Sequence, residues 1–258
     1  MLAEGRYLAQ AQPRGLMQAL AAEGHRVILI DSGAASLDLR DGNWLQGLDM
    51  LVARGRSPEL LARLALAEEA GLPTANRRGA IASVVDKAHM AAALCAARVP
   101  TPDTWIGPIE QLRRDIPHAA YPLVVKPVFG DNCRGVRIVT NRVALEILTW
   151  AEPCAIAQRF IPNDGFDVKL YAIGPHVWAM RKPSPLHATP GTATPIPLPA
   201  AWRELARRCG DVFGLHLFGV DCIERDGELL VIEVNDFPNY TGVPGADTLL
   251  AAHVLEHA

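Results

Sequence analysis

The sequence lacks the features that mark membrane-spanning, disulfide-bonded and nucleic-acid-binding proteins. No stretch of its 258 residues approaches the roughly 18 uninterrupted apolar residues of a membrane-spanning helix. Its 25 basic and 28 acidic residues give a net charge of -3, which leaves no excess positive charge for wrapping nucleic acid or an anionic membrane. The cysteines are odd in number, far apart and without a C-x-x-C pair, which argues against a disulfide framework or a zinc ribbon. They are Cys95, Cys133, Cys154, Cys209 and Cys222.

The N-terminal segment lacks the apolar core of a signal peptide, because Glu4 and Arg6 place charges within residues 1–12. We therefore expect a cytoplasmic protein whose partners include neither a membrane nor a nucleic acid. Hydrophobic residues make up 50% of the sequence and charged residues 21%, a balance that excludes a disordered chain or a coiled coil. The composition predicts a soluble globular protein, with one large domain or two to three fused lobes.

The first third of the sequence alternates between helical and strand patterns, which predicts an α/β N-terminal lobe. The segment V-P-T-P at residues 99–102 disfavours helix and predicts an extended linker, so we place a domain boundary near residue 100. The expected helices are 13–23, 58–70 and 85–97, and the expected strands are 26–31 and 48–53.

Beyond Pro122 the pattern changes to closely spaced strands with glycine-containing turns, which is typical of antiparallel sheets in an α+β fold. Residues 183–200 contain six prolines and predict a long loop, either a functional lid or a disordered segment. We expect three domains, covering residues 1–100, 101–165 and 166–258. The expected strands are 123–126, 136–139, 155–161, 167–173, 176–182, 216–224 and 229–235, with helices at 142–150 and 201–213.

The last predicted hairpin carries three oxygen donors. If residues 226–228 form a three-residue turn, Asp221 lies opposite Glu233. Asn235 lies two residues further along and therefore points to the same face of the sheet, whereas Cys222 points to the other face and into the core. Carboxylates on a mostly apolar strand are costly unless they are paired or bind a metal. We interpret the three as ligands of Mg²⁺, with Mn²⁺ as a substitute.

Lys126 ends the apolar strand L-V-V-K and is followed directly by a glycine-containing loop. Gly130, Arg134 and Gly135 lie in that loop, and two glycines with a cation are what a flexible flap over phosphates requires. On its own a lysine at the end of a strand is usually a surface cation. The metal ligands make the phosphate-binding interpretation the stronger one.

These segments, taken in order, resemble the ATP-grasp superfamily over about residues 73–250. The segments are Y-P-L-V-V-K-P, the glycine loop, A-Q-R-F-I, D-V-K-L-Y-A-I-G and F-G-V-D-C-I-E-R-D-G-E-L-L-V-I-E-V-N-D-F-P-N-Y-T-G-V. Within the superfamily the chain is similar to the RimK-type branch and to inositol 1,3,4-trisphosphate 5/6-kinases. The resemblance implies that two α+β lobes clamp ATP beside an N-terminal α/β domain.

The resemblance also implies roles for individual residues. Lys87 and Lys126 would bind the nucleotide phosphates, and the metal ligands would be those of the hairpin. The segment that begins at Gln158 would be the hinge, where the backbone near Phe160 and Ile161 holds adenine. Arg159 departs from the acid that family members commonly have at that position.

The acceptor decides the reaction, and the motifs leave two classes open. Lys169 and the pair Arg181 and Lys182 would face the acceptor, with Lys169 and Arg181 two or more strand positions from the metal face. A lysine at position 169 and the segment N-D-F-P-N-Y favour a kinase that phosphorylates a hydroxyl. The segment V-V-D-K-A-H-M and the following V-P-T-P favour a RimK-type ligase, as does the scarcity of basic residues near the loop.

Our preferred interpretation is a carboxylate–amine ligase that works through an acyl phosphate and releases ADP. An inositol-phosphate-type kinase is the alternative, and a non-catalytic nucleotide-binding module is the third possibility. The acceptor would be a small molecule or a peptide, and members of this branch are often homo-oligomers. No ligand spacing is evident among the histidines; His253 and His257, four residues apart on the terminal helix, are expected to be exposed.

Overall fold

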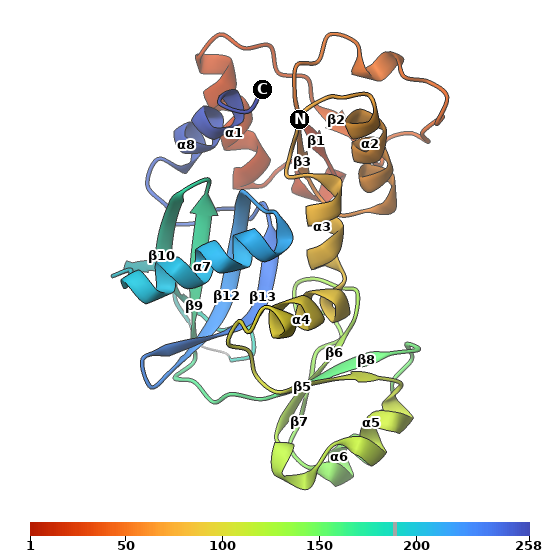
Figure 1. Ribbon diagram of the computed structural model, residues 1–258, viewed down its shortest axis with the longest axis vertical. Helices are drawn as coiled ribbons and strands as arrows, with labels where there is room; N and C mark the ends of the chain where they lie inside the picture. Colours follow the sequence, from red (N-terminus) through yellow and green to blue (C-terminus); the bar gives the residue numbers. More distant parts are fainter. Residues whose placement is uncertain (188–189) are drawn as a thin grey trace.

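Three β-sheets follow one another along the molecule in a computed structural model that describes residues 1–187 and 190–258 (Figure 1). The N-terminal sheet is parallel, with strand order β2-β1-β3-β4. A five-stranded antiparallel sheet, β11-β10-β9-β12-β13, lies in the middle, and a four-stranded antiparallel sheet, β5-β8-β6-β7, lies at the far end. The predicted α/β lobe and antiparallel α+β lobes are therefore both present.

The N-terminal lobe has short strands and two long helices. Ser57 caps the second helix by accepting a hydrogen bond from the Leu60 N–H at 3.3 Å, and Pro58 supplies the fixed φ that suits a first turn. Of the expected strand at 26–31, only the last two residues pair. The elements are β1 (Leu2–Ala3), η1 (Gly5–Tyr7), α1 (Ala11–Ala22), β2 (Ile30–Asp31), η2 (Asn43–Leu45), β3 (Leu51–Arg54), α2 (Pro58–Glu69) and β4 (Thr74–Ala75).

Two helices meet at a bend of 98°, and the sequence predicts only the second of them, as the helix at 85–97. They are α3 (Arg78–Val85) and α4 (Lys87–Ala96), separated by Asp86 in an extended conformation. The Asp86 carboxylate accepts from the N–H groups of Ala88 and His89, so it caps α4 and places Lys87 on its first turn. No single helix among the described residues has the length and hydropathy of a membrane span. The bent pair passes that test only when joined, and its apolar side chains lie in the core.

The central lobe packs two short helices on a small sheet. Its elements are β5 (Thr104–Gly107), α5 (Ile109–Asp115), η3 (His118–Ala120), β6 (Leu123–Pro127), β7 (Arg137–Val139), α6 (Arg142–Glu146) and β8 (Ala155–Arg159). Asn141 caps α6, which ends four residues earlier than the sequence pattern suggests. Strand β8 lies between β5 and β6, so Gln158 is opposite both Thr104 and Val124.

The C-terminal lobe consists of the five-stranded sheet with α7 across one face (Figure 1). Helix α7 buries Trp202, Leu205, Cys209 and Phe213, which recur at the spacing of one helical face. The elements are β9 (Phe166–Ile173), β10 (His176–Pro183), β11 (Thr194–Ile196), α7 (Ala200–Phe213), β12 (Leu217–Arg225), β13 (Glu228–Asp236) and α8 (Ala246–Leu255). The expected loop at 183–200 is wrong in part, because β11 pairs with β10; residues 188–189 of that prediction lie outside the described residues.

The β12–β13 hairpin reaches the predicted register by a different route. Arg225 pairs with Glu228, so the turn holds two residues, Asp226 and Gly227, both with positive φ. A β-bulge next to Asp221 then adds one residue to β13, and Asp221 pairs with Glu233. The predicted turn is one residue too long and the predicted ladder has no bulge, so the two errors cancel.

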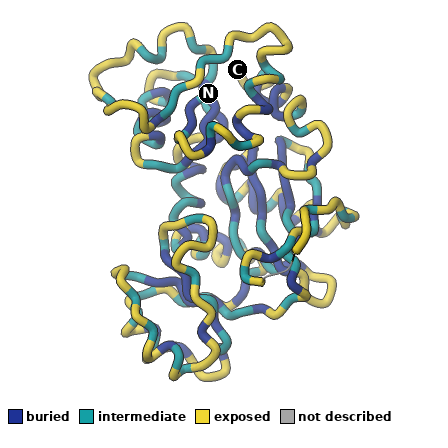
Figure 2. Tube along the Cα trace, turned by 180° about the vertical axis from the view of Figure 1, so that it is seen from behind, coloured by how far each residue is buried: buried dark blue, intermediate teal, exposed yellow. Residues whose placement is uncertain are grey.

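Buried residues run along the strands of the C-terminal sheet (Figure 2), and helices cover both of its faces. On one face, α3, α4 and α7 pack over Leu170, Val220 and Val231. On the other face, α1 and α8 pack against each other and cover Ile173 and Leu217. The three sheets fall within the expected ranges 1–100, 101–165 and 166–258, but helices cross between them; the division into domains stays a prediction.

Candidate active site

Lys169, Asp221 and Glu233 form a row across three adjacent strands of the C-terminal sheet. The ladder pairs Asp221 with Lys169 of β9 on one side and with Glu233 of β13 on the other. Paired residues of antiparallel strands point to the same face, so the three side chains lie side by side. Asn235 joins them, since its Nδ2 donates to Asp221 Oδ2 at 2.7 Å. The structure thus brings the three predicted metal ligands together.

Two lysines neutralise these carboxylates. Lys169 Nζ lies 2.7 Å from Asp221 Oδ1, and Lys87 Nζ, from the first turn of α4, forms an ion pair with Glu233. Burial alone would lower the pKa of Lys169, but the charge of Asp221 holds it above its ordinary value. Burial alone would raise the pKa of Glu233, but Lys87 and Lys126 hold it below its ordinary value. The expected separation between Lys169 and the face of the predicted metal ligands is wrong, because Lys169 contacts one of them, Asp221, directly.

Lys126 reaches this site from the central lobe. Its Nζ donates to Gln158 Oε1 at 3.2 Å, and Gln158 Nε2 donates to Thr104 Oγ1 at 3.1 Å. Both Lys126 and Gln158 are buried. Burial lowers the pKa of Lys126 to about 8, although Glu233 opposes the shift. The network therefore holds a readily deprotonated cation near the carboxylates.

The glycine loop between β6 and β7 folds toward the N-terminal lobe. Gly130 and Gly135 have φ values of +157° and +77°, conformations that a residue with a Cβ rarely adopts. Asp131 in the loop forms an ion pair with Arg6 of the N-terminal lobe. Arg134 is exposed. The loop is thus held across the gap between two lobes, as a flap over phosphates would be.

The predicted hinge lies at the end of β8. The Phe160 N–H donates to the Pro122 carbonyl at 2.9 Å, whereas Ile161 is buried beyond it. Arg159, which departs from the family pattern, turns outward and pairs with Asp103 at 2.9 Å. Of the two predicted adenine contacts, the Phe160 amide is therefore already engaged within the protein.

The structure separates Arg181 from the other predicted residues. Arg181 pairs with Val168 in the ladder, so it points to the face opposite Lys169; it binds Asp164 at 2.5 Å and lies over the Phe166 ring. The neighbouring Lys182 alternates to the site face. Burial and then the charge of Lys169 lower the pKa of Lys182, which indicates that the two ammonium groups lie near each other. Of the predicted basic pair, Lys182 is the one that faces the site.

Sequence reasoning missed two arginines from the N-terminal lobe, the buried Arg54 and the half-buried Arg56. Arg54 ends β3, and Arg56 follows one residue beyond Gly55. Arg56 lies 3.5 Å from the fully buried Asp236, and Arg54 donates to the Phe237 carbonyl. Residues just after a parallel strand meet at its carboxyl edge, where α/β sheets bind ligands, and that position was the available signal.

A cavity of about 670 Å³ adjoins these arginines. Arg6, Arg56 and Arg78 contribute positive charge to its lining, and Gly130 and Asp131 of the glycine loop close one side. Its other walls are apolar, formed by Pro58, Leu61, Ala62, Ala65, Val85 and Phe129. This combination suits an anionic group on an apolar body.

The donor set fits Mg²⁺. Two carboxylates and one amide oxygen lie on one sheet face, and hard oxygen donors are what Mg²⁺ prefers. The lysines that now pair with the carboxylates show that this spot accommodates positive charge.

A family model described as an ATP-grasp domain matches residues 84–242. The chain belongs to the ATP-grasp family. Its matched region contains both lysines, the glycine loop, the hinge and the hairpin ligands. The predicted fold, with two α+β lobes beside an α/β lobe, is thereby confirmed.

Relatives and solved structures extend this assignment. A probable alpha-L-glutamate ligase from Trichodesmium erythraeum (strain IMS101) is 29% identical over 90% of this chain and 86% of its own length. A RimK domain ATP-grasp protein from Sphaerobacter thermophilus has a TM-score of 0.81 at 23% identity, covering 98% of each chain. The ATP-grasp ligase PsnB, solved with a minimal precursor, Mg and ADP, has a TM-score of 0.74 at 20% identity, covering 100% and 96%. These similarities support the expected RimK branch and an ATP-dependent, ADP-forming ligase.

Proposed function

We propose that this ATP-grasp chain joins a carboxylate of a small molecule or peptide to an amine through an acyl phosphate. The observation that carries the proposal is the cavity lined by three arginines, of which Arg56 lies within electrostatic reach of Glu233 in the row of Lys169, Asp221 and Glu233. A carboxylate held there would face the nucleotide phosphates. ATP would then lie between the central and C-terminal lobes, with the carboxylate beside it against the N-terminal lobe.

At the nucleotide end, Lys87 and Lys126 bind the phosphates of ATP and neutralise their charge. Gln158 orients Lys126 by accepting its hydrogen bond. Asp221, Glu233 and Asn235 hold Mg²⁺, which when bound withdraws charge from the transferred phosphoryl group. The Lys87 ammonium, which pairs with the Glu233 carboxylate, would then also contact a phosphate of ATP, since both groups attract it.

At the acceptor end, guanidinium groups bind a carboxylate through paired hydrogen bonds. Arg56 is the best placed of the cavity arginines, because it also contacts Asp236 at the end of β13, the strand that carries Glu233. The apolar walls suit a carbon skeleton and would leave the hydroxyls of an inositol phosphate without partners. The cavity therefore favours a ligase over the kinase alternative.

The reaction conserves atoms and charge in two steps. An acceptor carboxylate oxygen attacks the γ-phosphorus of ATP, the bond from that phosphorus to the bridging oxygen breaks, and ADP leaves. The nitrogen of the amine then attacks the acyl carbon, phosphate leaves with its bridging oxygen, and the amine proton passes to water. Lys182 and Lys169 add positive charge on the acceptor side of the row.

Glutamate and peptides are the first substrates to try, because the Trichodesmium relative is named for glutamate and PsnB was solved with a precursor. Purified protein would receive Mg-ATP, hydroxylamine and a panel of amino acids, peptides and inositol phosphates. Hydroxylamine traps an acyl phosphate as a hydroxamate, so we expect ADP release and a hydroxamate, read by mass spectrometry. Glu233→Gln is the control and should give neither product. A stable phosphate ester without hydroxamate would identify a kinase and overturn the proposal.

A further inference from the structure

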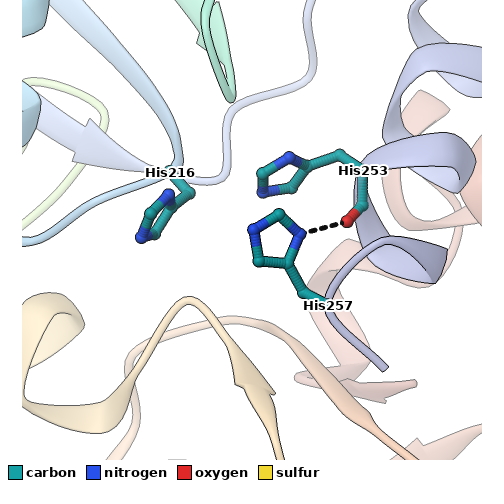
Figure 3. Close-up of side chains that lie close together, drawn as sticks. All are labelled: His216, His253 and His257. Carbon is teal, nitrogen blue, oxygen red and sulfur yellow. Dashed lines mark hydrogen bonds between the residues drawn. The ribbon is translucent and has the colours of Figure 1, made fainter.

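Three histidines converge on the side of the C-terminal lobe where α8 meets the start of β12 (Figure 3). His216 directly precedes β12, whereas His253 and His257 come from α8. One ring nitrogen from each residue lies within 4.8 Å of the other two. The expected exposure is wrong for His253, which is buried with 7% of its surface exposed, whereas His257 is exposed as expected; His216, distant in the sequence, completes the group.

The backbone fixes the position of His216. Its N–H donates to the side chain of the buried Asn76 at 3.0 Å, and its carbonyl accepts from the Gly174 N–H at 2.9 Å. Gly174 also leaves room for the neighbouring ring, because a Cβ at that position would lie 2.8 Å from His253 Nδ1. The cluster is therefore held by groups that are themselves buried or constrained.

The helix presents the other two rings as potential ligands. His253 and His257 are four residues apart and therefore lie on one face of α8. His257 Nδ1 lies 2.7 Å from the His253 carbonyl, so this nitrogen carries the proton and Nε2 keeps its lone pair. Burial, followed by the charges of His257 and His216, lowers the pKa of His253 to about 4, so its ring is neutral at pH 7.

We infer that His216, His253 and His257 form a binding site for one divalent transition-metal ion of the zinc type, separate from the nucleotide site. Imidazole nitrogens are ligands for Zn²⁺, Ni²⁺ and Cu²⁺, whereas Mg²⁺ prefers oxygen. In a tetrahedral zinc site the nitrogens lie roughly 3.4 Å apart, so the widest separation of 4.8 Å must close by about 1.4 Å. His216 and His257 are exposed and their side chains can rotate to close it.

The location indicates what such a metal would do. It would connect α8 to the strand that carries Asp221, five residues beyond His216 and roughly 16 Å away along β12. A metal there would fasten the C-terminal helix to the sheet and take no direct part at the nucleotide. His216 also lines a cavity of about 760 Å³ between α7 and the sheet, which gives a hydrated ion access.

The test is the binding of Zn²⁺ to the full chain without a polyhistidine tag. Isothermal titration in excess Mg²⁺, which occupies the oxygen ligands, should give one Zn²⁺ per chain and a higher Tm. His216→Ala and His257→Ala replace exposed residues, so they should fold normally by circular dichroism and yet lose at least tenfold in Zn²⁺ affinity. Co²⁺ should give the intense visible absorption of a four-coordinate site in the wild type but not in His216→Ala or His257→Ala.

His118→Ala is the matched control, because His118 is an exposed histidine in the central lobe. It should bind Zn²⁺ as the wild type does, and so should Asp221→Asn, which alters the other metal site. Failure of the wild-type chain to bind Zn²⁺ at micromolar concentration would overturn the inference. Unchanged affinity in both His216→Ala and His257→Ala would overturn it as well. Neither result would bear on the proposed ligase activity.

Discussion

Lys126 is the residue at which pH acts most directly on the proposed reaction. Its pKa of about 8, lowered from 10.5 by burial, means that the free protein loses this charge as the pH rises through 8. We expect kcat/KM for ATP to fall roughly tenfold per pH unit above pH 8. Initial rates at subsaturating ATP measure this limb. Lys126→Ala should be weakly active at all pH values and should lack the limb; an identical limb in this variant would assign it to another group.

The titration of Lys126 also affects the stability of the fold, and a rise in pH acts on it in the direction opposite to its effect on ATP binding. Its pKa is lower in the folded chain than in the unfolded chain, so the unfolded chain binds more protons between pH 8 and 10.5. Stability therefore gains a favourable contribution from Lys126 as the pH rises through that window. As the pH rises from 8 to 10.5, the titration of Lys126 should therefore weaken ATP binding and stabilise the free chain.

Substitution of Lys169 tests whether the reaction needs the positive charge in the row of Lys169, Asp221 and Glu233. Its ammonium lies 2.7 Å from Asp221 in a half-buried pair, so removing it costs less than the roughly 3–5 kcal/mol of a fully buried pair. Lys169→Met should therefore lower Tm and reduce kcat/KM at least about 100-fold. Lys169→Arg keeps the charge in a planar fork that suits a carboxylate, and a ligase should retain about a tenth of its activity. Steady-state assays of both variants decide; equal losses would mean that charge is not the requirement.

Individual site residues were predictable where the chain itself brings them together. Asp221, Glu233 and Asn235 belong to one hairpin, so counting along two strands brought them together, although the register came out right only because the turn length and the bulge offset each other. Lys169 was misplaced because its pairing with Asp221 depends on how β9 joins the sheet, which alternation along one strand does not reveal. Arg56 was missed for the same reason: only the packing of the N-terminal lobe brings it to Asp236.

At the scale of elements, two helical glycines should respond oppositely to alanine. Gly79 in α3 has open space where a Cβ would lie, so Gly79→Ala should stabilise the fold by about 0.4–1 kcal/mol. Gly210 in α7 would place a Cβ 2.8 Å from the Phe218 ring, and such overpacking costs about 1–3 kcal/mol. Urea unfolding of both variants measures the difference. Stabilisation by Gly210→Ala would show that α7 shifts freely on the sheet.

Elements with a strong local signal were predictable, and those that depend on distant partners were not. Helix α2 has its capping serine, proline and closing glycine in sequence, and its predicted span is correct within one residue. Strand β11 consists of Thr194, Pro195 and Ile196 within a proline-rich segment, and only pairing with β10 makes it a strand. Helix α3 was missed, whereas α4 was predicted with its start two residues early, because Asp86 fits a helix by composition although its side chain caps α4.

For the whole molecule, ATP and Mg²⁺ should stabilise the fold together. A ligand at about 100 times its Kd adds about 2.7 kcal/mol, which raises Tm by roughly 5–10 °C in a chain of this size. Chelation of Mg²⁺ should remove most of that shift, and Glu233→Gln should show little metal dependence. Differential scanning fluorimetry gives the comparison. The absence of a Tm shift with every nucleotide would contradict the assignment of the site.

The cytoplasmic location and the oligomeric state stay predictions.

The bulge in β13 determines which residues of that strand point to the core and which point to the site. Val231 faces the core and Glu233 faces the site, although residues two apart on a regular strand share a face. Ile232 is the one extra residue that reverses the alternation. Deleting it would make Val231 and Glu233 neighbours on a regular strand, where they would still point to opposite faces and keep their partners Cys222 and Asp221. Ile232 is therefore a position at which a single deletion leaves both the core face and the site face unchanged.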